Sequence, residues 1–373
     1  MDAVLNETQA LARALELAAQ GVPWGGNPRV GCVLLDAAGR VLAEGYHRGR
    51  GTPHAEVDAL HKLAKLPPER REAVHTAVVT LEPCNHYGLT PPCALALREA
   101  NVRRVIYADK DPNPDVTGGA ETLREAGITA ITATRAGLDM RVVSQVRNFN
   151  ELWLRAARRK RPWVIAKTAQ SLDGYASAAD GTSQWITGKI AREIGHRVRA
   201  LSDAVIIGTG TLLADHPSLS ARPGGILAEH QPRRVIIGER QNPWLHDYED
   251  ALHWRGRDLG ALLEALWKDH ARVVLIEGGP RLVAAAISDG LVDEHLVFTA
   301  PMILGAGTPA IPAPAATLDE AYIADTVTYY PLVADESGQT DLLTDLCWGS
   351  GSGILEFSAV VDAITKENEC SPD

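Results

Sequence analysis

The sequence reads HAE at residues 54–56 and TLEPCNHYGLTPPC at residues 80–93, and these two stretches set the architecture that we expect for its first half. Cys84 follows Glu56 after 28 residues, and Cys93 lies nine residues further along. One imidazole and two thiols are ligands that suit a tetrahedral zinc ion. Three protein ligands leave a fourth position for water, which is typical of a catalytic zinc site rather than a structural one.

His54, Cys84 and Cys93 are therefore the predicted zinc ligands, and Glu56 is the predicted catalytic residue. Glu56 lies two residues after His54 at the start of a predicted helix, so its carboxylate can stand beside the metal without ligating it. Zinc lowers the pKa of a bound water towards about 7. A neighbouring carboxylate can then carry the proton to a leaving amine. The pattern predicts a hydrolytic deaminase.

Two other interpretations of these residues stay open from the sequence. In the first, His54 is only a helix-start residue and the two cysteines are small buried side chains. In the second, the zinc is structural and needs a fourth protein ligand. The nearby candidates for that ligand are His61, His75 and His86.

Strands and helices are expected to alternate in the first half, which indicates a layered α/β domain. The expected helices cover residues 4–19, 53–66, 91–100 and 119–126, and the expected strands cover residues 30–36, 41–45, 76–81, 102–108 and 128–133. Thr90 is the expected N-cap of the third helix, with Pro91 at its first position.

A basic stretch, RAARRKR at residues 155–161, precedes Pro162 and suggests a domain boundary. We expect a deaminase domain over residues 1–150, a linker over 151–161, a second α/β domain over 162–346 and a tail of unknown role over 347–373. The second domain should contain strands at 163–168, 204–208, 234–237, 273–276 and 296–300, and helices at 189–201, 259–268 and 281–288.

Gly278-Gly279-Pro280 stands between a predicted strand and a predicted helix, so it is a candidate cradle for a phosphate group. Glycines let the backbone approach a ligand closely, and a helix N-terminus favours an anion. The stretch lacks the G-x-G-x-x-G pattern, so a Rossmann domain is not indicated.

Charge and composition favour small-molecule chemistry in a reducing compartment. The net charge is −10, made of +3 over residues 1–160 and −13 over residues 161–373, and aromatic residues make up 5% of the chain. A strongly basic, aromatic-lined channel for nucleic acid is therefore not expected. A membrane span and a secretory signal are not expected either, because the chain has no run of about 18 apolar residues and no basic, apolar N-terminal segment. Five cysteines do not suggest a disulfide framework, so we expect a cytoplasmic protein.

Several stretches of the first half closely resemble the deaminase half of the bifunctional riboflavin biosynthesis deaminase/reductase family. They are NPRVGC (27–32), GYHRGRGTPHAE (45–56), TLEPCNHYGLTPPC (80–93) and DPNPDVTGGA (111–120). The resemblance implies a cytidine-deaminase-like three-layer fold and a phosphorylated substrate, 2,5-diamino-6-(5-phosphoribosylamino)pyrimidin-4-one, which loses its 2-amino group. It also implies that Asn27 and His47 line the substrate pocket. The cysteines are spaced more widely than in a Pro-Cys-x-x-Cys motif, which argues against a nucleic-acid deaminase.

One position departs from the family pattern in this half. Leu89 stands where the family usually has a lysine or arginine that holds the substrate phosphate. Loss of such a charge-assisted contact costs about 1.5–3 kcal/mol. Arg48 or Arg50 is the expected replacement, and both are also compatible with ordinary surface charge.

Three stretches of the second half are similar to the reductase half of the same family. They are KTAQSLDGYASAADGTSQWITG (167–188), RALSDAVIIGTGTLLADHPSLSAR (199–222) and IEGGPRLVAAAISDGLVDE (276–294). The similarity implies a dihydrofolate-reductase-like fold and NADPH-dependent reduction of a ribosyl group to ribityl, giving 5-amino-6-(5-phosphoribitylamino)uracil. It implies cofactor contacts at Ala169, Trp185, Thr211, Asp215, Gly279, Pro280, Arg281, Leu282, Val283, Ala284 and Ala285. It implies substrate contacts at Lys167, Ser183, Arg199, Leu219, Arg222 and Glu277.

The second half also departs from the family. The segment between Arg222 and Glu277 is shorter than usual, Glu239 brings an acid near the expected cofactor phosphate, and the acidic tail after Tyr330 fits poorly. Leu89 and Glu239 leave room for a non-catalytic binding or regulatory module, whereas the intact His54, Glu56, Cys84 and Cys93 argue against one in the first domain. A free-nucleoside deaminase is the other alternative. By analogy with the family, a homodimer through the reductase domain is expected.

Overall fold

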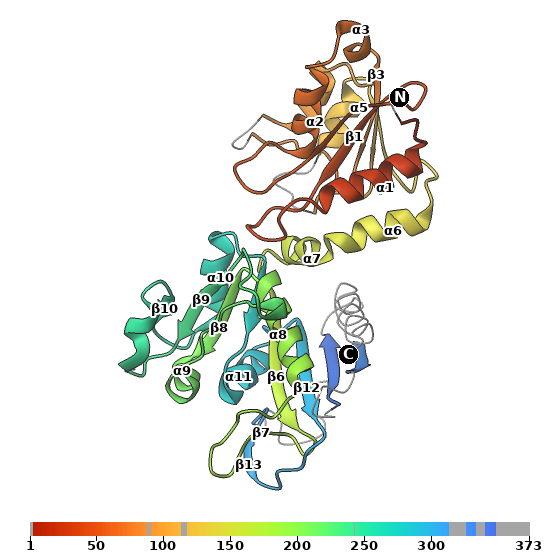
Figure 1. Ribbon diagram of the computed structural model, residues 1–373. Helices are drawn as coiled ribbons and strands as arrows, with labels where there is room; N and C mark the ends of the chain where they lie inside the picture. The colour runs from red at the N-terminus through yellow and green to blue at the C-terminus, as the bar shows by residue number, and fades with distance from the viewer. Residues whose placement is uncertain are drawn as a thin grey trace. The chain divides into compact units, whose positions relative to one another are not determined.

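The computed structural model describes residues 3–87, 91–112, 118–241, 243–312, 326–332 and 340–347. The chain divides into two compact units, with the boundary in the sequence between Arg159 and Lys160 (Figure 1). Within the described ranges, no helix combines the length and the apolar character needed to cross a membrane. Each unit has its own sheet and its own hydrophobic core.

The first unit is built on a five-stranded sheet in the order β2-β1-β3-β4-β5. Its strands are β1 (Gly31–Asp36), β2 (Val41–Tyr46), β3 (Val74–Val79), β4 (Arg104–Tyr107) and β5 (Thr129–Thr132). β1 runs antiparallel to both β2 and β3, whereas β3, β4 and β5 are parallel. The β1–β2 hairpin is closed by Asp36, whose carboxylate accepts hydrogen bonds from the backbone N–H groups of Ala38 and Arg40.

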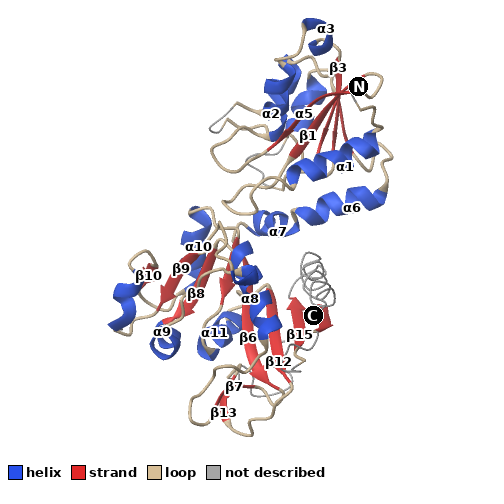
Figure 2. Ribbon diagram, in the orientation of Figure 1, coloured by secondary structure: helices blue, strands red, loops and turns tan. Residues whose placement is uncertain are grey.

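Helices cover both faces of this sheet, as Figure 2 shows. The first unit has one hydrophobic core on each face of its sheet. Alternate residues of β1 belong to different cores, because successive side chains of a strand point to opposite faces. Val33 and Leu35 pack with α1 (Glu7–Ala18) and α6 (Met140–Phe149). Cys32 and Leu34 pack on the other face, whose helices are α2 (Ala55–Leu63), α4 (Cys93–Glu99) and α5 (Gly119–Glu125). The three-layer prediction for this unit is confirmed.

Several helices of this unit differ from the sequence expectation. The helix predicted to start after Thr90 begins at Cys93, with Pro92 in the N-cap position, and Thr90 itself lies outside the described residues. The cause is Pro92, because a proline disfavours helical dihedrals in the residue before it, here Pro91. The segment 151–161, expected as a linker, contains helix α7 (Glu151–Arg159), which buries Leu154. A short helix, α3 (Pro68–Arg71), and α6 were not predicted.

The second unit contains an eight-stranded sheet in the order β10-β9-β8-β11-β6-β12-β15-β14. The strands from β10 to β12 in this order are parallel, and β15 runs antiparallel to β12 and β14. Their bounds are β6 (Trp163–Ser171), β8 (Ala204–Gly208), β9 (Arg233–Ile237), β10 (Leu252–Trp254), β11 (Val273–Ile276), β12 (Glu294–Ala300), β14 (Thr326–Pro331) and β15 (Leu342–Cys347). β7 (Tyr175–Ala178) and β13 (Gly307–Pro309) pair separately.

The helices of this unit are α8 (Lys189–Leu201), α9 (Thr209–Asp215), α10 (Leu259–Lys268) and α11 (Pro280–Ser288), with 3₁₀ turns η1 (Pro223–Gly225) and η2 (Pro243–Tyr248). The bounds predicted for α8, β8, α10 and β11 coincide with those observed. α10 and α11 share one core with the sheet. Because β6, β8 and β11 are parallel, their carboxyl ends meet at one edge, which is where open α/β sheets bind ligands.

Asp293 holds the start of this sheet together and gives a test of the fold. Its side chain is fully buried, accepts two hydrogen bonds of 2.7 Å from the Arg161 guanidinium and one of 2.8 Å from the Val164 backbone N–H. Asp293→Ala leaves a partly buried cation without its partner, so we expect a loss of about 3–5 kcal/mol of unfolding free energy in urea denaturation. Glu264→Ala breaks only the exposed pair with Lys268 and should change little. Equal losses in the two variants would contradict this account.

Candidate active sites

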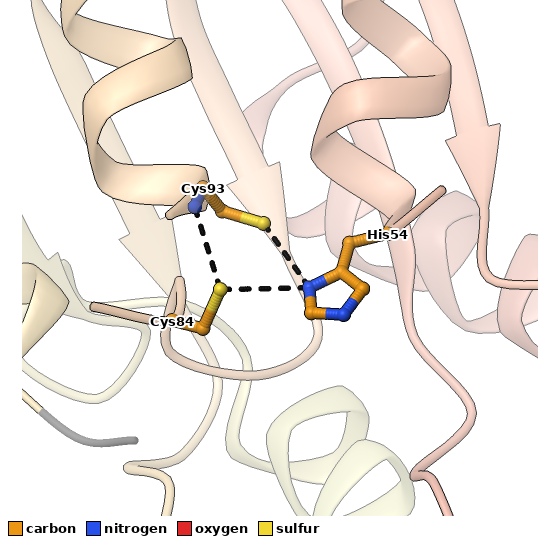
Figure 3. Close-up of side chains that lie close together, drawn as sticks. All are labelled: His54, Cys84 and Cys93. Atoms are coloured by element: carbon orange, nitrogen blue, oxygen red, sulfur yellow. Dashed lines mark hydrogen bonds between the residues drawn. The ribbon is translucent and has the colours of Figure 1, made fainter. Parts of the chain in front are cut away.

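His54, Cys84 and Cys93 come together at one end of the first sheet (Figure 3). His54 is the N-cap of α2, Cys93 is the first residue of α4, and Cys84 lies in the loop after β3. The His54 Nδ1 atom lies 3.5 Å from the Cys84 Sγ atom and 3.3 Å from the Cys93 Sγ atom. The sequence predicted that these three residues meet, and the fold brings them together.

The geometry of this cluster fits a tetrahedral zinc ion. All three ligand atoms lie within 4.8 Å of one another. Nitrogen and sulfur ligands at ordinary zinc bond lengths stand about 3.5 Å apart in a tetrahedron, which matches the observed separations. Across the described part of the chain, His61, His75 and His86 do not join the cluster as a fourth ligand. The arrangement therefore suits a site that keeps one position for solvent.

The charges around the cluster also favour a metal cation. The pKa of Cys84 is lowered to about 4, first by the side-chain hydrogen bond with Cys93 and also by the bond with His54, so Cys84 is a thiolate. The Cys93 backbone N–H lies 3.4 Å from the same sulfur and donates to it. Glu56 is 3% exposed, and burial, followed by the Cys84 charge, raises its pKa to about 7. A carboxyl group with that pKa can both accept and donate a proton near neutrality.

Asn27 and His47, the two predicted substrate residues of this unit, lie next to each other and beside the cluster. The His47 ring is 5.3 Å from the His54 ring. Its Nδ1 atom is 3.1 Å from the Pro53 carbonyl oxygen and its Nε2 atom is 2.9 Å from Asn27 Nδ2. Nδ1 therefore carries the proton and Nε2 accepts from the Asn27 amide. Burial lowers the pKa of His47, which keeps this ring neutral.

Arg48, one of the two arginines expected to replace the missing phosphate-binding cation, is already engaged in an ion pair. The Arg48 guanidinium binds the Asp58 carboxylate at 3.0 Å, so a phosphate would have to compete for it. Arg50 is exposed. Leu89 lies outside the described residues.

In the second unit, Lys167, Arg199 and Glu277 form a half-buried network beside the carboxyl end of β11. Arg199 donates two hydrogen bonds to the Glu277 carboxylate, at 2.5 and 3.0 Å, and the Lys167 Nζ atom lies 3.7 Å from Glu277. Burial alone would raise the pKa of Glu277, but the two cations outweigh it and lower the pKa. Burial lowers the pKa of Lys167. Three of the predicted substrate residues are thus in contact.

His196 joins this network to the loop of Arg222, and sequence reasoning missed it. Its Nδ1 atom lies 3.2 Å from the Ser220 carbonyl oxygen, 3.3 Å from the Arg222 backbone nitrogen and 3.4 Å from an Arg199 guanidinium nitrogen. The available signal was its spacing, because residues three apart on a helix share a face. Leu219, another predicted contact, is 2% exposed.

Most of the predicted cofactor residues are accessible, and two of them, Val283 and Ala284, are buried. Gly279 is the N-cap of α11, and its backbone N–H donates to the Thr211 hydroxyl at 2.6 Å. Thr211 and Gly279, both predicted, are therefore neighbours. Val283 and Ala284 instead point into the protein interior. The exposed and half-buried remainder consists of Ala169, Asp215, Pro280, Arg281, Leu282 and Ala285.

Trp185 and Ser183 lie on the segment between β7 and α8. Trp185 is 66% exposed, and the Arg192 guanidinium lies over its ring at 4.7 Å. Ser183 is half-buried. An exposed tryptophan held by a cation offers a flat apolar surface to a ring-shaped ligand.

Glu239, the acid that departs from the family, is exposed just after β9. The next residue, Arg240, extends back over α9, where one guanidinium nitrogen lies 3.9 Å from the place that a Cβ atom on Gly210 would occupy. Arg240 therefore places a positive charge near the acid Glu239 at this edge of the sheet. The sequence did not predict this pairing of charges.

Comparisons with known protein families cover most of the chain. Residues 5–109 match the family model described as the cytidine and deoxycytidylate deaminase zinc-binding region, and residues 162–319 match the RibD C-terminal domain. These two matches correspond to the two units of the structure.

Individual relatives and solved structures agree with these matches. The riboflavin biosynthesis protein RibD of Corynebacterium ammoniagenes is 42% identical over 294 residues, which cover 77% of this chain and 83% of that protein. RibD of Escherichia coli (strain K12) is 36% identical over 340 residues, which cover 81% and 89%. The structure of Acinetobacter baumannii RibD, form 1, superposes with a TM-score of 0.74 at 33% identity, over 92% of this chain and 99% of that one.

A Thermotoga maritima structure, titled a diaminohydroxyphosphoribosylaminopyrimidine deaminase/5-amino-6-(5-phosphoribosylamino)uracil reductase, gives a TM-score of 0.73 at 28% identity, over 91% and 99% of the two chains. The architecture and the family relationship predicted from the sequence are therefore confirmed. The chain belongs to the RibD family of riboflavin biosynthesis enzymes, which join a zinc-binding deaminase domain to a reductase domain.

Proposed function

We propose that the first unit deaminates 2,5-diamino-6-(5-phosphoribosylamino)pyrimidin-4-one with zinc held by His54, Cys84 and Cys93. The observation that carries the proposal is the convergence of these three ligand atoms beside the buried carboxyl group of Glu56. When bound, zinc supplies a Lewis acid that makes water nucleophilic at neutral pH. Asn27 and His47 lie where they can hold the polar edge of a pyrimidine ring.

Glu56 is the proton carrier in this proposal. Its carboxylate takes a proton from the attacking water and delivers it to the amine that leaves as ammonia. The buried setting that raises its pKa to about 7 suits both halves of this task. His47, neutral and fixed by Pro53 and Asn27, orients the substrate rather than exchanging protons.

We propose that the second unit uses NADPH to reduce the ribosyl side chain of the deaminated product. NADPH supplies the hydride, while the protein orients both partners. Thr211 and the start of α11 at Gly279 offer a hydroxyl group and a helix N-terminus to the cofactor. Arg222 is exposed and suits the substrate phosphate, whereas Lys167 and Glu277 offer half-buried polar groups to the sugar.

The proposal also covers the substrate class, the cellular compartment and the oligomeric state of the enzyme. A phosphorylated pyrimidine is the partner that these sites suit, and the modest charge of the first unit gives no support to a nucleic-acid substrate. We propose a cytoplasmic enzyme, in which zinc-binding thiols stay reduced. A homodimer through the reductase domain is proposed by analogy with the family alone.

Glu56→Gln tests the proton carrier. The amide has nearly the same shape but cannot accept the proton, so ammonia release should fall about 10²- to 10⁴-fold. Zinc content per chain and NADPH consumption with the deaminated substrate should stay as in the wild type, because Glu56 is not a proposed ligand and lies in the other unit. Ammonia release at the normal rate would show that Glu56 has a different role.

Gly119→Ala tests the support of the zinc loop. A Cβ atom on Gly119 would lie 1.8 Å from the Pro83 carbonyl oxygen and 3.4 Å from that of Cys84, so the loop must move. We expect zinc content measured after dialysis to fall well below one ion per chain. The matched control is Gly31→Ala, whose Cβ atom would lie 1.9 Å from the Ala14 carbonyl oxygen, against α1 on the other face of the sheet. That variant should lose stability yet keep its zinc, and similar zinc loss in both would count against the specific role of Gly119.

Arg222→Ala tests the phosphate contact of the reductase. Losing a charge-assisted hydrogen bond should raise the KM for the phosphorylated substrate about 10- to 100-fold, with little change for the dephosphorylated compound. Arg233→Ala is the control, because Arg233 begins β9 at the opposite edge of the parallel strands and pairs with Asp269. An unchanged KM in Arg222→Ala would refute the phosphate assignment.

A further inference from the structure

Asp341 stands in a part of the chain that neither family match reaches, since the second match ends at residue 319. Its side chain is 4% exposed. The Oδ2 atom accepts a hydrogen bond of 2.7 Å from the backbone N–H of Gly188, in buried surroundings. Because a buried carboxylate is costly without such donors, the contact fixes both partners in place.

The topology places Asp341 at the functional edge of the reductase sheet. Asp341 immediately precedes β15, and β15 runs antiparallel to β12 with Leu342 opposite Thr299. Thr299 in turn lies beside Gln170 near the carboxyl end of β6. An antiparallel strand starts where its parallel neighbours end, so Asp341 lies near the carboxyl end of β6, beyond the level of Lys167, at the edge where Glu277 follows β11. Figure 2 shows β15 beside β12.

Gly188, the partner of Asp341, is the N-cap of α8 and ends the segment that carries Ser183 and Trp185. Trp185 is exposed, but the chain turns inward directly after it, because Ile186 and Thr187 are buried. Arg192 donates a hydrogen bond of 2.6 Å to the Thr187 carbonyl oxygen, and its guanidinium lies over the Trp185 ring. Arg192 of α8 and Asp341 both help to hold the segment in place.

The same helix carries part of the proposed substrate site. Arg199 of α8 forms the ion pair with Glu277, and His196 contacts the loop of Arg222. The start of α8 therefore has Trp185 before it and Arg199 three turns along it. A shift of this start would move both the proposed cofactor surface and the proposed substrate contact.

We propose that Asp341 is a positioning residue of the reductase site, which holds the segment 183–188 and the start of α8 so that Trp185 and Arg199 are aligned for NADPH and substrate. This inference rests on the proposed reductase function. Asp341 acts through Gly188, and it is assigned no contact with either ligand.

The experiment compares Asp341→Ala, Asp341→Asn and Asp258→Ala in the full-length chain. Asp341→Ala removes the acceptor, whereas the amide oxygen of Asp341→Asn can still accept from Gly188. Asp258→Ala is the matched control, because Asp258 caps α10 through a bond of 2.8 Å from the Ala261 N–H and lies on a helix without proposed site residues. Amide hydrogen exchange of the peptide around Gly188, kcat/KM for NADPH and ammonia release by the deaminase are measured for each.

In Asp341→Ala we expect faster exchange around Gly188 and a fall of about tenfold in kcat/KM for NADPH, the effect of losing one buried charge-assisted bond. Asp341→Asn should recover most of both, and ammonia release should stay unchanged in all variants. Gly188→Pro removes the donor instead, at a φ of −69° that proline adopts, and should lower kcat/KM similarly. If Asp341→Ala does not fold, Gly188→Pro tests the proposal in its place.

Unchanged exchange around Gly188 in Asp341→Ala would overturn the proposal, as would a loss of NADPH use no greater than in Asp258→Ala. A wild-type chain that neither binds nor oxidises NADPH would instead refute the reductase function. The hydrogen-exchange comparison needs no cofactor, so it would still judge the contact between Asp341 and Gly188 in that case.

Discussion

Three ligand atoms must meet within a few ångströms of one another, and the first unit is organised around that requirement. His54 Nδ1 and the two cysteine sulfurs come from a helix N-cap, a loop and the first residue of another helix. The helices α2 and α4 lie on the same face of the sheet, so their N-terminal ends can converge. Gly119 has no Cβ atom, which lets α5 press against the loop that carries Cys84. Packing of the sheet and its helices thus determines whether a metal can bind.

The same requirement sets the chemistry of Glu56. Placed two residues after the histidine, in the first turn of α2, its carboxyl group is carried into the interior with the ligand. Burial then raises its pKa to about 7, and the thiolate of Cys84 adds to the effect. A group on a solvated loop would stay ionised and would be a poorer proton donor. One short sequence, HAE, therefore fixes both the position and the acidity of the proposed proton carrier.

Much of this could be predicted from the sequence because local and chemical signals agreed. β8, α8, α10 and β11 were predicted with their observed bounds, since each is an apolar or amphipathic stretch between clear breaks. The His54, Cys84 and Cys93 cluster was predicted because few side chains can perform that chemistry. His196 was missed, since its spacing from Arg199 places it on the same helix face but does not reveal its partners, which the fold brings beside it in Ser220 and Arg222. The segment that forms helix α7 was predicted to be a linker, because its arginines make the sequence polar overall. The buried side of the helix, which includes Leu154, does not stand out in that sequence.

The C-terminal strands show most clearly where single-sequence reasoning fails. In β15, Leu343 is fully buried, as a core strand requires, but the acid Asp345 is buried as well, and so is Asp341 just before the strand. Acidic residues within a strand sequence normally indicate its solvated face, so the sequence around β15 resembles an exposed tail. Asp341 is buried because a partner 153 positions earlier in the chain, the Gly188 N–H, needs an acceptor at the edge of the sheet. Such a pairing depends on the path of the whole chain, and neither periodicity nor composition near residue 341 contains it.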